Sequence, residues 1–152
     1  MNLAENIFVE GNRRNPHIDF NRYTGELILS GKSIPENAAK VYEPLLFWIE
    51  DYIKSPRPTT NLRLNLEYFN TATSIWLAKL VKSLCGIKKE DCTFFIHLYF
   101  EIEDFDEMDT EDLKEVLGSL LDNVAEITVN LAIRTYGIDE GGKILKESTV
   151  LV

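Results

Sequence analysis

The chain has 152 residues, of which 45% are hydrophobic and 27% are charged, and its formal net charge is −9. This length suits a single domain with a substantial core, so we expect one domain over residues 1–152. The acidic charge would repel a phosphate backbone, which argues against DNA or RNA binding. No apolar run approaches the about 20 residues that a membrane-spanning helix needs. With two cysteines and no signal-peptide pattern, the sequence predicts a reduced, cytoplasmic protein.

The N-terminal part of the chain predicts short strands. Residues 7–9 predict a first strand, and the alternating runs 16–20 and 26–30 predict a hairpin. The residues between these two runs end in Gly25, which suits a tight turn. We expect Gly31 to end the second strand of the hairpin.

A helix is predicted next. Ser33 and Glu36 have the S-x-x-E spacing of a capping box, which predicts a helix start at this point. The helix should end by Lys54, because residues 55–60 have the composition of a linker. Pro44 removes a backbone donor inside the helix and should kink or break it.

The stretch from Leu62 to Leu84 is the centre of the fold, and it predicts a strand, a polar turn and a helix. Apolar residues alternate over residues 62–69, and the period changes to that of a helix from Ile75 onwards. The residues that alternate on one side of this strand are Leu62, Leu64, Leu66 and Tyr68. The turn at residues 70–74 carries Asn, Thr and Ser side chains, which can cap a helix or accept a phosphoryl group. The residue pattern alone leaves both interpretations open.

The C-terminal half begins with an interior strand and an acidic segment. Residues 93–100 are apolar on both faces, which is typical of a strand with neighbours on both sides. Residues 101–112 predict a solvated loop that leads into a helix, with Asp109 or Thr110 as N-cap.

The chain then predicts two more strands. Alternation over residues 127–133 predicts a strand, residues 136–142 a turn, and residues 143–152 a further edge strand. Two strands, two helix–strand units and a closing strand together predict an α/β fold. We expect a mixed β-sheet with its helices mainly on one face.

Three motifs carry a resemblance to a known family. The sequence contains SGKSIPEN at residues 30–37, VYEPLLFWIEDY at residues 41–52 and LEYFNT at residues 66–71. In order and spacing these motifs resemble the SiaC family of bacterial regulatory phosphoproteins, over about residues 16–100. The resemblance implies a STAS-like fold, similar to the domains of anti-sigma-factor antagonists, with Thr71 as the phosphoacceptor.

The resemblance also implies partners. SiaC-like proteins are switched by a Ser/Thr kinase and a PP2C-type phosphatase, and the unphosphorylated form binds and activates a diguanylate cyclase in cyclic di-GMP signalling. This sequence departs from the family pattern after the acceptor. Ala72 replaces a small hydroxyl residue, and Ile75 or Trp76 replaces a common lysine. These departures bear on which kinase and which output partner the resemblance implies for this sequence.

The expected site is therefore the turn around Thr71. The residues that we expect to form the turn or to contact a partner are Tyr68, Asn70, Thr73, Ser74, Glu36 and Asn37. The alternative function is a constitutive STAS-like interaction module in which Thr71 is only a cap.

An enzyme is not expected, because the sequence has no phosphate-binding glycine loop and no nucleophile elbow. His17 and His97 both fall in predicted strands and are expected to be structural. We expect no cofactor and no metal, and a monomer when the protein is free.

Overall fold

The computed structural model describes residues 5–88 and 90–151, which contain seven strands and four helices. The strands are β1 (Ile7–Val9), β2 (His17–Asn21), β3 (Glu26–Ser33), β4 (Thr59–Phe69), β5 (Thr93–Glu101), β6 (Asn130–Ile138) and β7 (Ile144–Leu151). The helices are α1 (Ala38–Tyr52), α2 (Thr71–Cys85), α3 (Ile102–Glu107) and α4 (Thr110–Leu121).

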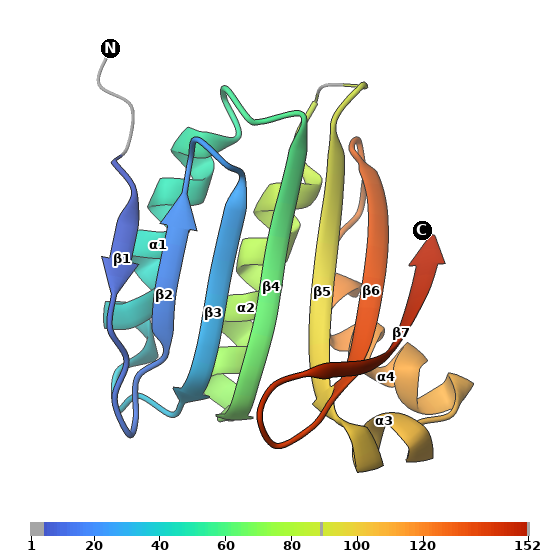
Figure 1. Cartoon of the computed structure of the whole chain (residues 1–152). Helices are drawn as coiled ribbons and strands as arrows, with labels where there is room; N and C mark the ends of the chain where they lie inside the picture. The colour runs from blue at the N-terminus through green and yellow to red at the C-terminus, as the bar shows by residue number, and fades with distance from the viewer. Residues whose placement is uncertain (1–4, 89, 152) are drawn as a thin grey trace.

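The seven strands form one sheet, and their order across the sheet follows the order of the chain. The pairs β1–β2 and β2–β3 are antiparallel, the pairs from β3 to β6 are parallel, and β7 returns antiparallel to β6. Parallel neighbours need crossover connections, which the helices supply. α1, α2 and α4 lie behind the strands in Figure 1, on one face of the sheet. The predicted mixed sheet with helices mainly on one face is therefore confirmed.

The core lies between the sheet and these helices. Along β3, Leu27 and Leu29 are fully buried while Ile28 points to the opposite face, as the period of a strand requires. The helix side chains that complete the core include Tyr42, Leu45, Ile49, Leu77, Leu80 and Leu84. Burial of each such side chain stabilises the fold by about 1.5–3 kcal/mol. β5 pairs with a strand on either side, so its prediction as an interior strand is confirmed.

β3 does not end at Gly31, as the sequence predicted. The strand continues to Ser33, and its register with β4 shifts between Gly31 and Lys32. Gly31 has a φ of 87°, a conformation that glycine adopts at little cost, so β3 passes through the irregularity in register instead of ending there.

The predicted capping box of Ser33 and Glu36 is also wrong. α1 begins at Ala38, and the side chain of Asn37 caps it by accepting a hydrogen bond from the backbone N–H of Lys40. Ser33 is the last residue of β3 and is fully buried. It is therefore too early in the chain to cap α1.

The bulge changes the face on which the end of β4 points its side chains. Leu66 pairs with Gly31 and Tyr68 pairs with Lys32, so Glu67 is the extra residue on β4. Regular alternation would place Tyr68 on the buried side, but its side chain is 65% exposed. The Lys32 ammonium group lies 5.8 Å from the centre of the Tyr68 ring. The bulge thus points the aromatic side chain of Tyr68 into the solvent.

Of the kink or break that was predicted at Pro44, the break does not occur. α1 is one helix from Ala38 to Tyr52 with Pro44 inside it. Pro44 is exposed, while the residues that follow it at helical spacing, Leu45, Trp48 and Ile49, are buried. Packing of this face against the sheet outweighs the loss of one backbone hydrogen bond.

The acidic segment 101–112 contains a helix, α3, where the sequence predicted a loop. A Cβ atom on Gly137 of β6 would lie 2.7 Å from Ile102 and 3.0 Å from Phe105, so α3 packs closely against bare backbone. This tertiary contact is not visible in the local pattern of carboxylates. Asp109 caps α4 and forms a capping box with Asp112, which confirms one of the two predicted caps.

β6 lies later in the chain than the strand predicted at residues 127–133. β6 covers Asn130–Ile138, so the predicted turn at residues 136–142 begins only at Asp139. β6 pairs with β5 and β7 along its length, and these pairings extend it beyond its alternating stretch. The predicted edge strand is confirmed as β7, which pairs with β6.

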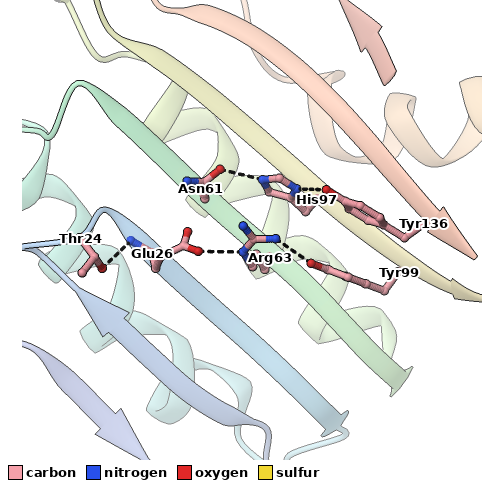
Figure 2. Close-up of polar contacts among 7 residues, drawn as sticks. All are labelled: Thr24, Glu26, Asn61, Arg63, His97, Tyr99 and Tyr136. Carbon is pink, nitrogen blue, oxygen red and sulfur yellow. Dashed lines mark hydrogen bonds and ion pairs between the residues drawn. The ribbon is translucent and has the colours of Figure 1, made fainter. Parts of the chain in front are cut away.

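Polar side chains join neighbouring strands on the face of the sheet opposite the core (Figure 2). Arg63 of β4 donates hydrogen bonds to the Glu26 carboxylate of β3, at 3.0 Å, and to the Tyr99 hydroxyl of β5, at 2.8 Å. The Glu26–Arg63 pair is partly exposed, so its contribution to stability is small. These contacts link three strands across the face that α1, α2 and α4 leave uncovered.

His97 of β5 is the buried centre of this polar face (Figure 2). One ring nitrogen lies 2.7 Å from the Asn61 amide oxygen, and the other lies 2.7 Å from the Tyr136 hydroxyl. Burial, with added repulsion from Arg63 and Arg134, lowers the pKa of His97 to about 4. The neutral imidazole therefore links β4, β5 and β6, and the predicted structural role of His97 fits its position.

The shifted pKa of His97 predicts an acid-dependent loss of stability. Between the ordinary pKa of 6.5 and the folded value of about 4, the unfolded chain binds a proton that the folded chain excludes. The free energy of unfolding should therefore fall as the pH drops through this window, by up to about 3 kcal/mol from this group. Denaturant titrations at pH 7, 5.5 and 4 measure the slope.

His97→Gln removes the titrating group and should flatten this part of the pH profile, whatever its effect at pH 7. His17→Gln changes the exposed histidine of β2 and should retain the slope, because His97 is still present. An identical pH profile for the wild type and His97→Gln would contradict the assignment.

Candidate functional site

Thr71 is the first residue of α2 and directly follows the N-cap residue Asn70. The predicted polar turn of residues 70–74 is therefore shorter than expected, because Thr71 to Ser74 already belong to the helix. The Asn70 side chain accepts a hydrogen bond of 2.9 Å from the backbone N–H of Thr73. Asn70 thus fills the capping role that the sequence also allowed for the Thr and Ser residues.

The hydroxyl groups in this first turn differ in accessibility. Thr71 is exposed, and its hydroxyl has no hydrogen-bond partner among residues 5–88 and 90–151. Thr73 is fully buried and donates to the carbonyl oxygen of Ser33 at 2.9 Å. Ser74 is partly buried and donates to the carbonyl oxygen of Thr71 at 2.7 Å. Of the three hydroxyl groups, that of Thr71 is the one exposed to solvent without a hydrogen-bond partner among the described residues.

The end of β3 and the residues after it hold the turn in place. The backbone N–H of Asn70 donates to the Ser33 carbonyl at 3.1 Å, and its side-chain amide donates to the Pro35 carbonyl at 3.5 Å. The structure therefore brings the SGKSIPEN motif against the Asn-Thr turn, although Asn37 and Asn70 are 33 positions apart in the sequence. Sequence analysis placed these motifs in one site only by resemblance.

Glu36 and Asn37 lie on this same segment and are exposed. Glu36 forms an ion pair with Arg14 at 2.9 Å, and both side chains are largely in solvent. Asn37 is the N-cap of α1. Their positions allow contact with a partner that covers the turn, but each already has a local structural role.

Exposed apolar side chains precede and follow Thr71 along the chain. Tyr68 is 65% exposed, Phe69 54% and Ile75 54%. Ile75 lies four residues after Thr71, on the same side of α2. Ile34, which directly follows the Ser33–Phe69 pair of β3 and β4, is also exposed. We call the surface formed by Ile34, Tyr68, Phe69, Thr71 and Ile75 the switch surface.

Sequence reasoning missed most of the switch surface. The helical period placed Ile75 on the buried stripe of α2, but the stripe begins with Thr73 and Leu77 instead. Phe69 was predicted only as a strand residue. Phe69 and Ile75 are large apolar residues at the end of a strand and near the start of a helix, where few neighbours can cover them. This combination of size and position is the signal that could have revealed their exposure.

Neither a cluster of metal-binding side chains nor a membrane-spanning helix is found among the described residues. Among residues 5–88 and 90–151, no group of three or more His, Cys, Asp or Glu side chains could hold a metal ion. No helix in this part of the chain is long and apolar enough to cross a membrane.

Solved structures with a similar fold come from Pseudomonas aeruginosa. The chain is 18% identical to apo-SiaC, with a TM-score of 0.62, and the match covers 86% of this chain and 98% of that chain. It is also 18% identical to a chain in the crystal structure of the diguanylate cyclase SiaD in complex with its activator SiaC, with a TM-score of 0.65. That match covers 86% of this chain and 99% of the other. At this identity the matches establish the fold.

The sequence itself establishes the family. No curated protein matches the chain. The family model described as SiaC family regulatory phosphoprotein matches residues 9–129, which include the turn at Thr71 and the SGKSIPEN motif. The chain therefore belongs to the SiaC family of regulatory phosphoproteins.

Proposed function

We propose that this protein is a phosphorylation-switched regulatory binding protein with Thr71 as its switch. A Ser/Thr kinase adds the phosphoryl group, a PP2C-type phosphatase removes it, and the unphosphorylated form binds and controls a diguanylate cyclase. Family membership supports the regulatory role. The complex of SiaD with its activator SiaC, a protein of the same fold, supports a cyclase as the partner.

The position of Thr71 is the observation that carries the proposal. Its side chain is exposed at the start of α2, while the neighbouring Asn70 and Thr73 are fixed by hydrogen bonds. Phosphorylation transfers the γ-phosphoryl group of ATP to the Thr71 oxygen, breaks its bond to ADP and releases the hydroxyl proton. Hydrolysis by the phosphatase restores the hydroxyl group and releases inorganic phosphate.

The switch surface gives the modification its effect. An apolar partner surface can pack on Tyr68, Phe69 and Ile75 when Thr71 carries only a hydroxyl group. A phosphoryl group adds nearly two negative charges at the centre of this surface. Desolvation of an unpaired dianion in such an interface costs several kcal/mol, so the complex dissociates.

In this proposal the protein has no enzymatic activity of its own and is a monomer when free. The kinase uses ATP and a diguanylate cyclase uses GTP, so the protein works in the cytoplasm. Tyr68, Glu36 and Asn37 are accessible for partner contact, whereas Thr73 is buried and Asn70 and Ser74 shape the turn.

The first prediction is that protein purified from its native host carries a phosphoryl group on Thr71 in part of the population. Intact-mass spectrometry before and after treatment with a PP2C-type phosphatase should show a shift of one phosphoryl group, and phosphopeptide mapping should place it on Thr71. Thr73 should be unmodified, because its oxygen is buried. A phosphoryl group on Thr73 or Ser74 alone would contradict the proposal, and an unmodified protein under all growth conditions would favour a constitutive interaction module.

The second prediction concerns affinity for diguanylate cyclases purified from the native host. Thr71→Ala should bind as the wild type does, because it removes only a hydroxyl group. Thr71→Glu should bind about a hundredfold more weakly, because a carboxylate must lose its solvent within the interface. Calorimetry, with cyclic di-GMP synthesis as a second readout, measures both effects. Equal affinity of the two variants would place the turn outside the interface.

A pair of tyrosines provides the control for this experiment. Tyr68→Ala removes an exposed ring from the switch surface and should weaken binding by about tenfold or more. Tyr23→Ala removes a ring of similar exposure, 73%, from the β2–β3 turn and should leave affinity unchanged. Equal losses for the two variants would show that the partner does not select the switch surface.

A further inference from the structure

Three buried hydroxyl groups connect the first turn of α2 to α1. The Ser33 oxygen lies 2.6 Å from the Tyr42 hydroxyl and 2.8 Å from the Thr73 hydroxyl. All three residues are fully buried, and they come from β3, α1 and α2 respectively. Burial also raises the pKa of Tyr42, so its hydroxyl keeps its proton. We call this group of Ser33, Tyr42 and Thr73 the hydroxyl chain.

The direction of the hydroxyl chain follows from proton counting. Each hydroxyl group has one proton to donate. Thr73 donates to the carbonyl oxygen of Ser33, which can only accept. The Ser33 hydroxyl must then donate to Thr73, and the Tyr42 hydroxyl must donate to Ser33. The chain therefore runs from α1 through β3 to α2, and every proton in it is used.

The same backbone carbonyl anchors the other side of Thr71. The Ser33 carbonyl oxygen accepts from the backbone N–H of Asn70 as well as from the Thr73 hydroxyl. Asn70 in turn caps the backbone N–H of Thr73. The residues on both sides of the exposed Thr71 and Ala72 are therefore held by Ser33.

We propose that Ser33 is a positioning residue that couples the phosphorylation state of Thr71 to the first two turns of α1. This inference rests on the proposed function, because it describes how the same switch is transmitted. Ser33 lies within the SGKSIPEN motif and is the last residue of β3. In this proposal the motif therefore has a role other than capping a helix.

The physical basis is competition at the start of α2. The first backbone N–H groups of a helix attract anions, and a phosphoryl group on Thr71 lies beside them. Its oxygens compete with the Asn70 side chain for the N–H of Thr73. When Thr73 moves, its hydroxyl leaves the Ser33 oxygen and carbonyl, and the bond from Tyr42 weakens in turn. Buried polar networks respond to such a loss as a unit, because no water replaces the missing partner.

Hydrogen exchange tests the coupling without knowledge of the kinase. The full chain is produced with genetically encoded phosphothreonine in place of Thr71 and is compared with the unmodified chain. We expect the backbone amides of residues 38–43 and 45 to exchange about tenfold faster in the phosphorylated protein, the effect of one lost hydrogen bond. In Ser33→Ala, phosphorylation should change the exchange of these amides by less than about twofold.

Two further variants keep the result interpretable. Tyr42→Phe removes the first donor of the hydroxyl chain while retaining the ring, and it should also abolish the tenfold effect even if Ser33→Ala does not fold. Ser30→Ala changes a serine of the same strand whose side chain points to the opposite face, and it should retain the effect. Unchanged exchange in the phosphorylated wild type, or the full effect in both Ser33→Ala and Tyr42→Phe, would overturn the inference. An unphosphorylated Thr71 in the native host would refute the proposed function, yet the exchange result would stand.

Discussion

The parallel pairing of the last residues of β3 and β4 determines where the functional turn lies. Ser33 pairs with Phe69, and the next residue of β4, Asn70, is held by the Ser33 carbonyl. α2 can only begin where Asn70 caps it, so Thr71 becomes the first helical residue. Without the continuation of β3 past Gly31, the start of α2 would have no anchor in the sheet.

The register shift between Gly31 and Lys32 has a second consequence, because side chains of β4 before it and after it differ in burial. Before the bulge, Leu62 and Leu64 are buried beneath the helices. After it, Tyr68 and Phe69 are exposed beside Thr71. An irregularity of one residue thus leaves aromatic side chains exposed at the end of β4 while the core of the sheet stays regular.

Much of the fold follows from the sequence, because alternation and helical period are local properties. The strands with clear alternation, the interior strand β5 and the mixed sheet were predicted, and the motif resemblance located Thr71. The failures at Gly31, Ser33 and the acidic segment have one cause. Each depends on a contact with a distant segment: the pairing of β3 with β4, the burial of Ser33 under Tyr42, and the packing of α3 on Gly137. A local pattern carries no information about such contacts.

In the candidate site, too, local patterns could be predicted from the sequence and contacts with distant segments could not. The position of Thr71 at a strand–helix boundary could be predicted, because the motif resemblance located it there, whereas its role as phosphoacceptor stays a prediction. The burial of Thr73 and the exposure of Ile75 could not, because the helical period alone leaves the orientation of α2 uncertain by about one residue. The hydrogen bonds to Ser33, together with the buried leucines of α2, fix this orientation, which turns Thr73 inward and leaves Thr71 and Ile75 on the outer side.

The departures from the family pattern change how the charge at Thr71 would act. In the family pattern that the motifs resemble, a lysine follows this threonine within a few positions. Here Ile75 occupies the position one turn after Thr71, and Lys79 lies over the Trp76 ring at 4.3 Å. A phosphoryl group on Thr71 therefore faces an apolar neighbour on its own side of α2. When a partner binds such a surface, a phosphoryl group there would lose its solvent, which costs free energy. The proposed switch therefore works by excluding the partner. It needs no new ion pair.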